Sequence, residues 1–429
     1  MPGLVQHGPV RTRIGAGTLL VTCLVAACSS PTRVATEHHA PAAAPAAPAE
    51  TASPAEAALR LEALVGQHSI LAADMMRARV RADADLAQSA NAALGNNTKA
   101  MGDVLEPVLG GAGRQEFEEA WAQHIEALFN YSRGLATRDE EVRTDAESEL
   151  LEYEEDLAEF FVAASQGRLD RRAALAGVRE HVDHLVEGAD AYAAGRKAEA
   201  AELYRVSYAH SFDLGEGLAR ALLPPGVGAE LDRPTMRLRA ALTRLLDEHV
   251  ALVLAAMRSA VTDGADLRSV GDAVNANTLD LTSAVDALFG AAAAAGFQSH
   301  WADHIDQLMA YTKATAAHDT AGQERARRTL QGFEQTFATF LDDATQHRLG
   351  QQALAQAFVM HDRMLLAQID AYAAKDYAQA HDLGYQTYED MFTVAGQLST
   401  AIGSTVASRL PTGGSQTGGG GTAGRVESR

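Results

Sequence analysis

Apolar positions recur at three- and four-residue steps along most of the chain. One such stretch runs through Leu61, Leu64, His68, Ala72 and Met75. This spacing is the period of an amphipathic helix, and the alternation typical of a half-buried strand is absent from the sequence. The hydrophobic pattern therefore predicts an all-α protein.

Short breaks interrupt this pattern at regular intervals. They divide residues 57–222 into six segments of about 24 to 28 residues, and they lie near Ala82–Asp83, Gly110–Gly113, Thr137–Asp139, Gly167–Asp170 and Gly195. Long helices joined by short connections pack as antiparallel neighbours. The segments are thus expected to form an up-and-down helical bundle.

The pattern occurs twice. A shift of 180 residues aligns 97–212 with 277–392 without a gap, and it places Trp121 on Trp301, the only two tryptophans. Further upstream the shift becomes 181 residues and pairs His68 with His249. A long gapless match indicates a duplicated domain. The sequence thus predicts two tandem up-and-down bundles of about six helices each, a first copy at 57–224 and a second copy at 235–404.

The N-terminus has the pattern of an export signal. Arg11 and Arg13 precede an uncharged, mostly apolar run at 14–27. Because a bilayer span needs roughly 20 residues, this run is too short to cross a membrane and fits the apolar region of a signal peptide. It ends in Val25-Ala26-Ala27, and Cys28 follows.

This ending resembles the lipobox of bacterial lipoproteins. The repeated Trp-x-x-His-Ile motif, which begins at Trp121 and Trp301, is also similar to tandem-repeat helical lipoproteins of high-GC Gram-positive bacteria. The resemblance implies a signal peptide at 1–27, a lipid such as palmitate on Cys28, and an extracytoplasmic protein anchored to the cell membrane.

The regions that flank the copies have compositions that do not build a core. Residues 28–56 combine the lipidated cysteine with an Ala/Pro-rich linker, which is typical of a semi-rigid spacer. Residues 405–429 are rich in glycine and are expected to form a disordered tail.

Cysteine content and charge narrow the range of functions. The only two cysteines, Cys23 and Cys28, lie in or beside the signal, so the mature chain has no disulfide and no cysteine zinc site. Cleavage removes two of the 36 basic residues and none of the 56 acidic ones, which leaves 34 − 56 = −22. This charge argues against nucleic acid as a partner, while a protein partner stays open.

The repeated histidines are the main candidate for a site. His68, His124 and His181 lie about ten or eleven residues into the first, third and fifth segments, which run in the same direction. At about 1.5 Å of rise per residue, their imidazoles are expected at nearly the same height. His210 in the sixth segment is also expected near mid-height. The second copy has His249, His304 and His361, with Asp390 where the first copy has His210.

Three interpretations of these residues remain open. They could bind a transition-metal ion such as copper, zinc or iron, for which imidazole and carboxylate are ordinary ligands. They could form a structural layer, bonded to one another or to Asn97, Tyr131 or Tyr192, or they could line a small-ligand pocket.

Enzyme signatures are missing from the sequence. There is no Glu-x-x-His pair of di-iron type, no serine-hydrolase elbow and no phosphate-binding glycine loop. We therefore expect a non-enzymatic binding protein, with a structural or adaptor lipoprotein as the alternative.

Overall fold

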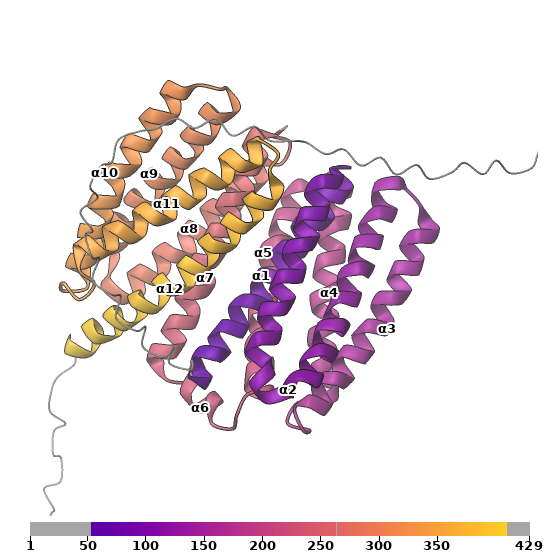
Figure 1. The fold of residues 1–429 in the computed structure, drawn as a ribbon. Helices are drawn as coiled ribbons and strands as arrows, with labels where there is room; N and C mark the ends of the chain where they lie inside the picture. Colours follow the sequence, from indigo (N-terminus) through magenta and orange to yellow (C-terminus); the bar gives the residue numbers. More distant parts are fainter. Residues whose placement is uncertain (1–52, 263, 410–429) are drawn as a thin grey trace, which may run out of the picture. The chain divides into compact units, whose positions relative to one another are not determined.

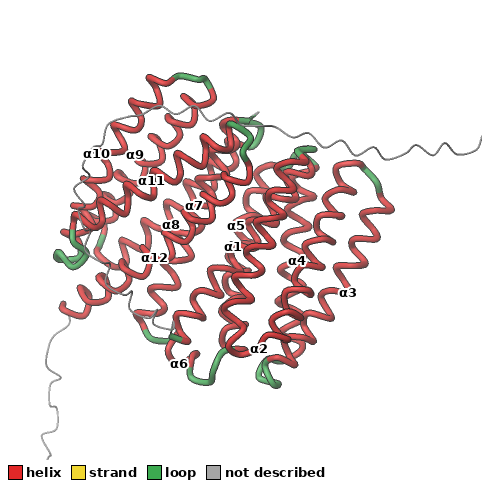
Figure 2. The backbone as a smooth tube through the Cα atoms, in the orientation of Figure 1, coloured by secondary structure: helices red, strands yellow, loops and turns green. Residues whose placement is uncertain are grey.

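The computed structural model describes residues 53–262 and 264–409, and within these ranges it contains twelve helices and no strand (Figures 1 and 2). The all-α prediction is confirmed. The first copy consists of α1 (Pro54–Val80), α2 (Ala84–Thr137), α3 (Glu140–Ala164), α4 (Arg171–Ala193) and α5 (Lys197–Leu222).

A short helix, α6 (Val227–Leu231), lies in the connection between the copies. The second copy consists of α7 (Pro234–Val261), α8 (Leu267–Phe289), α9 (Ala291–Ala316), α10 (Thr320–Ala344), α11 (Gln351–Ala373) and α12 (Tyr377–Arg409). The bounds of α10 and α11 are those of α3 and α4 shifted by 180 residues, so the duplicated sequence folds into equivalent helices.

A glycine in each copy produces the break expected after the second segment. Gly110 has φ 70° and ψ 169°, and it divides α2 into two helical parts. Gly290 has φ 88° and ψ 168°, and it separates α8 from α9. These positive φ angles are readily available only to glycine. The six predicted segments of the first copy thus appear as five helices, one of which is broken.

Two predicted boundaries were wrong by a few residues. The linker was expected to reach residue 56, but α1 begins at Pro54, where the Ser53 hydroxyl accepts a hydrogen bond of 3.2 Å from the Glu56 N–H. The tail was expected from 405, but α12 continues to 409. Thr405 is fully buried, and its hydroxyl lies 2.9 Å from the Thr345 carbonyl oxygen. Cys28, the predicted signal peptide, most of the linker and residues 410–429 lie outside the described residues.

Within each copy, helices that follow one another in sequence pack together. α1 contacts α2 and α5, and α3 contacts α2 and α4. In the second copy α7 contacts α8 and α12, as α1 contacts α2 and α5 in the first.

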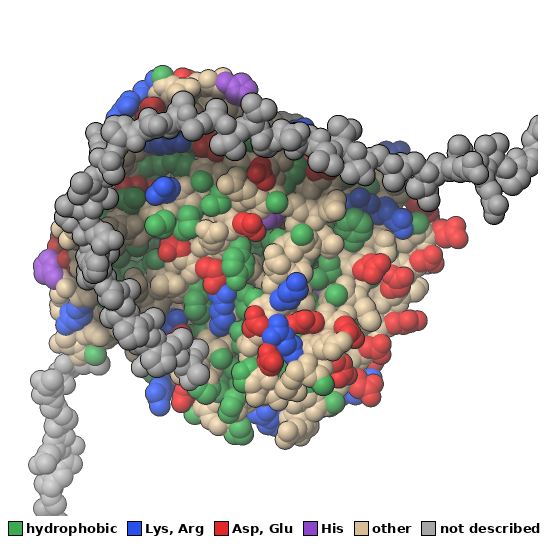
Figure 3. All heavy atoms as spheres, viewed as in Figure 1, with side chains coloured by type: hydrophobic (Ala, Val, Ile, Leu, Met, Phe, Trp, Pro, Cys, Tyr) green, Lys and Arg blue, Asp and Glu red, His purple; other side chains and the backbone are tan. Residues whose placement is uncertain are grey.

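Acidic side chains gather over α3 on the face shown in Figure 3. No helix of the described ranges combines the length and apolar character needed to cross a bilayer.

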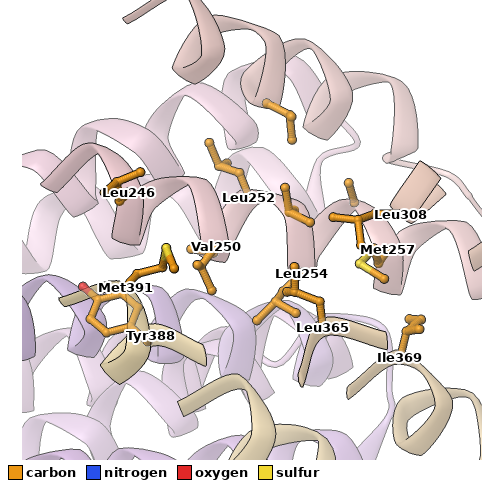
Figure 4. Close-up of a cluster of buried hydrophobic side chains, with 14 of the residues drawn as sticks. Leu246, Val250, Leu252, Leu254, Met257, Leu308, Leu365, Ile369, Tyr388 and Met391 are labelled. Carbon is orange, nitrogen blue, oxygen red and sulfur yellow. The ribbon is translucent and has the colours of Figure 1, made fainter. Parts of the chain in front are cut away.

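The two copies share buried side chains. The described residues of both copies belong to one compact unit, and one of its hydrophobic clusters joins Ile70 and Tyr208 of the first copy to Leu246 and Val250 of the second. Figure 4 shows the second-copy side of this cluster, with Tyr388 and Met391 of α12 beside residues of α7.

Contacts between the copies are reciprocal. The Tyr208 hydroxyl donates to the Arg244 carbonyl oxygen at 3.1 Å, and the Tyr388 hydroxyl donates to the Ala63 carbonyl oxygen at 2.9 Å. The tyrosines are equivalent by the 180-residue shift, and the carbonyl groups are equivalent by the 181-residue shift. Such mutual contacts are typical of surfaces related by a two-fold axis.

Candidate functional site

Three histidines of the first copy converge in its interior. His68 on α1, His124 on α2 and His181 on α4 are at most 1% exposed. One ring nitrogen from each lies within 4.8 Å of the others. The equal heights expected from the sequence therefore bring these three imidazoles together.

Hydrogen bonds fix how the rings of His68 and His124 are protonated. The Trp121 Nε1–H group donates to His68 Nδ1 at 3.1 Å, so the proton of a neutral His68 ring is on Nε2. His68 Nε2 lies 2.9 Å from His124 Nε2 and donates to it. His181 Nδ1 pairs with the Ser211 hydroxyl at 2.9 Å. In this arrangement His68 Nε2 carries a proton and has no lone pair for a metal ion.

Burial keeps the three rings neutral. Loss of solvent lowers the pKa of His124 to about 3. The pKa values of His68 and His181 are also well below the ordinary value, first because of burial and then because of the neighbouring histidines. The cluster therefore adds no positive charge to the interior at neutral pH.

The polar partners expected in a structural layer bond elsewhere. The Asn97 amide donates to the Leu64 carbonyl oxygen at 3.0 Å and to Gln67 Oε1 at 2.9 Å. The Tyr131 hydroxyl donates to Asp190 Oδ1 at 2.8 Å. Neither group bonds to the histidines, whose partners are Trp121, Ser211 and one another.

The second copy has a different set of convergent groups. His304 on α9 joins His361 and Asp362 on α11, with one ligand atom from each within 4.8 Å of the others. All three are at most 3% exposed. His304 Nδ1 lies 3.4 Å from Asp362 Oδ1. His304 Nδ1 and His361 Nδ1 have no hydrogen-bond partner, and the Asp362 carboxylate has none while it is ionised. When Asp362 is protonated, its carboxyl can pair with that of Glu334.

These unpaired atoms make the second-copy group energetically unusual. A buried polar atom without a partner costs roughly 1–3 kcal/mol. Burial and then the neighbouring Glu334 raise the pKa of Asp362, while burial lowers the pKa of His361 to about 4. A bound cation would give all of these atoms a partner at once.

His249 lines the same interior but lies outside the group. Its ring centroid is 6.0 Å from that of His304 and 4.5 Å from that of Trp301. Trp301 Nε1 and both ring nitrogens of His249 have no hydrogen-bond partner. The tryptophan–histidine hydrogen bond of the first copy is therefore missing at the equivalent place in the second.

His210 does not join the buried histidines, which corrects the expectation from its height. It belongs to a partly exposed group with Glu180 and His184. His210 Nε2 donates to the Gly177 carbonyl oxygen at 3.0 Å, and its Nδ1 lies 3.7 Å from Glu180 Oε2. Since α5 meets α4 at Gly177, the His210 ring lies beside Glu180 rather than in the interior.

Asp390, the second-copy equivalent of His210, is likewise not part of the group of His304, His361 and Asp362. It is half-buried, and burial raises the pKa of its carboxyl. The sequence reasoning selected Asp390 and missed Asp362. The signal for Asp362 was nevertheless present, because this acid follows His361 at a position where the first copy has Val182.

The two tryptophans provide a matched test of the hydrogen bond to His68. Trp121→Phe should leave His68 Nδ1 buried and unpaired, whereas Trp301→Phe removes an N–H that already lacks a partner. Both variants lose similar volume, so Trp121→Phe should cost about 1–3 kcal/mol more. Urea unfolding followed by circular dichroism measures the difference, and equal losses would contradict this account of the hydrogen bond.

The chain matches no protein-family model, and searches of curated proteins and of solved structures gave no significant match, so its function is inferred from its own residues.

Proposed function

We propose that this chain is an extracytoplasmic lipoprotein, anchored to the cell membrane through Cys28, that binds a transition-metal ion through His304, His361 and Asp362. In this proposal it is a binding protein and not an enzyme. Each copy forms its own up-and-down bundle, and the ion lies inside the second. The N-terminal pattern of the sequence supports the anchor and the location.

One observation carries the metal site: three buried ligand groups converge, and the Nδ1 atoms of His304 and His361 have no hydrogen-bond partner. Two imidazoles and a carboxylate suit zinc, copper or iron. Such ligands lie about 2.0–2.2 Å from zinc, so neighbouring ligand atoms approach within about 3.5 Å of each other. The side chains therefore need only small shifts from their present separations.

A packing role is the second candidate, and the first copy favours it. The chain of hydrogen bonds from Trp121 through His68 to His124 occupies both nitrogens of His68 and Nε2 of His124, whereas His124 Nδ1 and His181 Nε2 have no partner. These bonds also join α1 to α2, which supports a role in fixing how the helices pack. We therefore assign packing to the first-copy histidines and metal binding to the second-copy group.

The test is metal content of the full-length protein, purified without chelator or histidine tag and then titrated with Zn²⁺. Asp362→Val introduces the residue of the first copy, and it should remove one equivalent of bound metal without unfolding the protein. Removing an unpaired buried carboxyl should also raise the free energy of unfolding. Elemental analysis and calorimetry give the stoichiometry.

Two matched variants identify the site that binds. His124→Ala alters the first-copy cluster and His210→Ala alters the exposed group, and both should keep the equivalent that Asp362→Val loses. Absence of bound metal, or its retention in Asp362→Val, would overturn the proposal. Loss of that equivalent only in His210→Ala would place the ion at the surface instead.

A further inference from the structure

A cavity of about 420 Å³ lies where the two copies meet, and α1, α2, α7 and α12 all contribute to its wall. Val250, Leu254 and Tyr388, which Figure 4 labels, form part of its apolar lining. The volume is within the range of about 300–1,000 Å³ that is common for small-molecule sites. None of the histidines discussed above lines it.

In the first copy, the side chain of Tyr204 fills the space that is equivalent to part of this cavity. The Arg77 guanidinium lies between two tyrosine rings, with its Cζ 5.4 Å from the centroid of Tyr192 and 4.5 Å from that of Tyr204. Tyr204 is only 5% exposed. An arginine stacked on aromatic rings gains cation–π attraction in addition to packing.

The second copy retains half of this arrangement. Arg258, the equivalent of Arg77, lies 5.6 Å from the ring centroid of Tyr372. The position of Tyr204 is taken by Gly384, so the second ring is missing. A Cβ placed on Gly384 would lie 3.6 Å from Arg258 Nη2, which shows that the guanidinium borders the space that the ring would fill. Both Arg258 and Gly384 line the cavity.

Two buried polar atoms on the cavity wall have no partner. His381 Nδ1 lies 2.8 Å from the Tyr377 carbonyl oxygen, which can only accept, and 3.0 Å from the Ser89 hydroxyl. With the ring proton on Nδ1 to make the first of these bonds, Nε2 has a free lone pair. Arg258 pairs through Nη1 with Asp74 at 2.9 Å, but its Nε–H is unpaired. The cavity thus offers one unpaired buried acceptor and one unpaired buried donor beside apolar side chains, and charged residues such as Lys99 and Asp103 also line it.

We propose that this cavity binds a small aromatic molecule that carries a hydroxyl group. Its ring occupies the space left by the missing tyrosine and stacks on Arg258, as Tyr204 stacks on Arg77. Its hydroxyl group pairs with the free nitrogen of His381. This site is separate from the proposed metal site, and either can exist without the other.

The probe is p-cresol, which is the tyrosine side chain as a free molecule, added to the full-length protein. Calorimetry and ligand-observed NMR measure its dissociation constant. Toluene lacks the hydroxyl group and 4-methylcyclohexanol lacks the aromatic ring, so both should bind more weakly. For 4-methylcyclohexanol the expected loss is roughly 3- to 30-fold, the range to which one cation–π contact corresponds.

A variant that restores the tyrosine should abolish binding. A Cβ on Gly384 would lie 3.3 Å from Leu254 Cδ1, so a larger side chain there would meet this leucine, and the first copy has the smaller Ala73 at the place of Leu254. The variant therefore combines Gly384→Tyr with Leu254→Ala. Leu254→Ala alone, which enlarges the cavity, is the control and should still bind p-cresol.

The first copy supplies the converse experiment. Tyr204→Ala should open an equivalent space beside Arg77, and p-cresol should raise the melting temperature of this variant more than that of the unaltered protein. Unchanged p-cresol binding in the Gly384→Tyr, Leu254→Ala variant would overturn the proposal. Equal affinity for p-cresol and 4-methylcyclohexanol would also overturn it, because the ring would then make no specific contact.

Discussion

Lowering the pH of the metal-free protein from 6.5 to 4.5 should reduce its free energy of unfolding by an amount on the order of several kcal/mol. Seven buried histidines cause this loss, and burial lowers the pKa of each: His68, His124, His181, His249, His304, His361 and His381. In the unfolded chain they titrate near pH 6.5. Below that pH the unfolded state takes up protons that the folded state does not, so stability falls as the pH falls.

Buried carboxyl groups oppose part of this effect. Burial raises the pKa of Glu62 to about 8, and it also raises the pKa values of Asp247 and Asp362. These groups stay protonated in the folded protein and ionise in the unfolded chain above about pH 4, so they favour the folded state as the pH falls. The partly buried Glu154, Glu334 and Asp390 have raised pKa values as well, but their burial is weaker than that of the histidines. Unfolding at acid pH is therefore expected to take up protons on balance, each worth about 1.4 kcal/mol per pH unit.

Urea unfolding in the presence of chelator, measured from pH 8 to pH 4.5, tests whether the buried histidines outweigh the buried carboxyl groups. Stability should be greatest near pH 6.5, because only the carboxyl groups act at higher pH and they weaken the fold there. His124→Leu removes one of the seven histidines and should reduce the acid-side slope by about 1.4 kcal/mol per pH unit. Stability that is constant or rises below pH 6 would contradict the neutral state of these rings.

Most of the fold followed from local sequence patterns. The apolar period predicted helices. Gly110 predicted a break, because glycine readily adopts the positive φ angle that interrupts α2 there. The duplicated sequence predicted equivalent helices in the two copies. The ends of α1 and α12 were less predictable, because Ser53 and Thr405 stabilise them through particular hydrogen bonds.

The sequence predicted how far along each helix the site residues lie, but it did not predict in which direction their side chains point. One residue of error moves a side chain only about 1.5 Å along a helix, and so His68, His124 and His181 were correctly brought together. The same residue of error rotates the side chain by about 100° around the axis. A difference of this size decides that His210 points away from the interior and that Asp362 points into it. The apolar pattern did not predict either side-chain direction.

The sequence also did not predict that the two copies share a hydrophobic core. Tyr208 and Tyr388 occupy apolar stripes, and nothing in the pattern distinguishes a residue buried inside one copy from a residue buried between the two. The hydrogen-bond partners are no easier to predict, since each tyrosine bonds to a backbone carbonyl group of the other copy.

Replacing either of these tyrosines with alanine should cost about 3–5 kcal/mol of unfolding free energy. Tyr208 is 1% exposed and Tyr388 is 4% exposed, so each substitution removes a buried ring together with the hydroxyl group that donates to a helix carbonyl of the other copy. Tyr208→Phe and Tyr388→Phe keep the ring and should cost only about 1–2 kcal/mol. Urea unfolding measures all four variants.

The double variant tests whether the two copies unfold together. The two hydroxyl groups lie 3.3 Å apart, so the losses in Tyr208→Phe and Tyr388→Phe should not add, with a coupling of about 0.5–3 kcal/mol. A single unfolding transition in every variant is expected, because each tyrosine stabilises both copies through one shared cluster. Two separate transitions, with each substitution shifting only one of them, would show instead that the copies are energetically independent despite their reciprocal contacts.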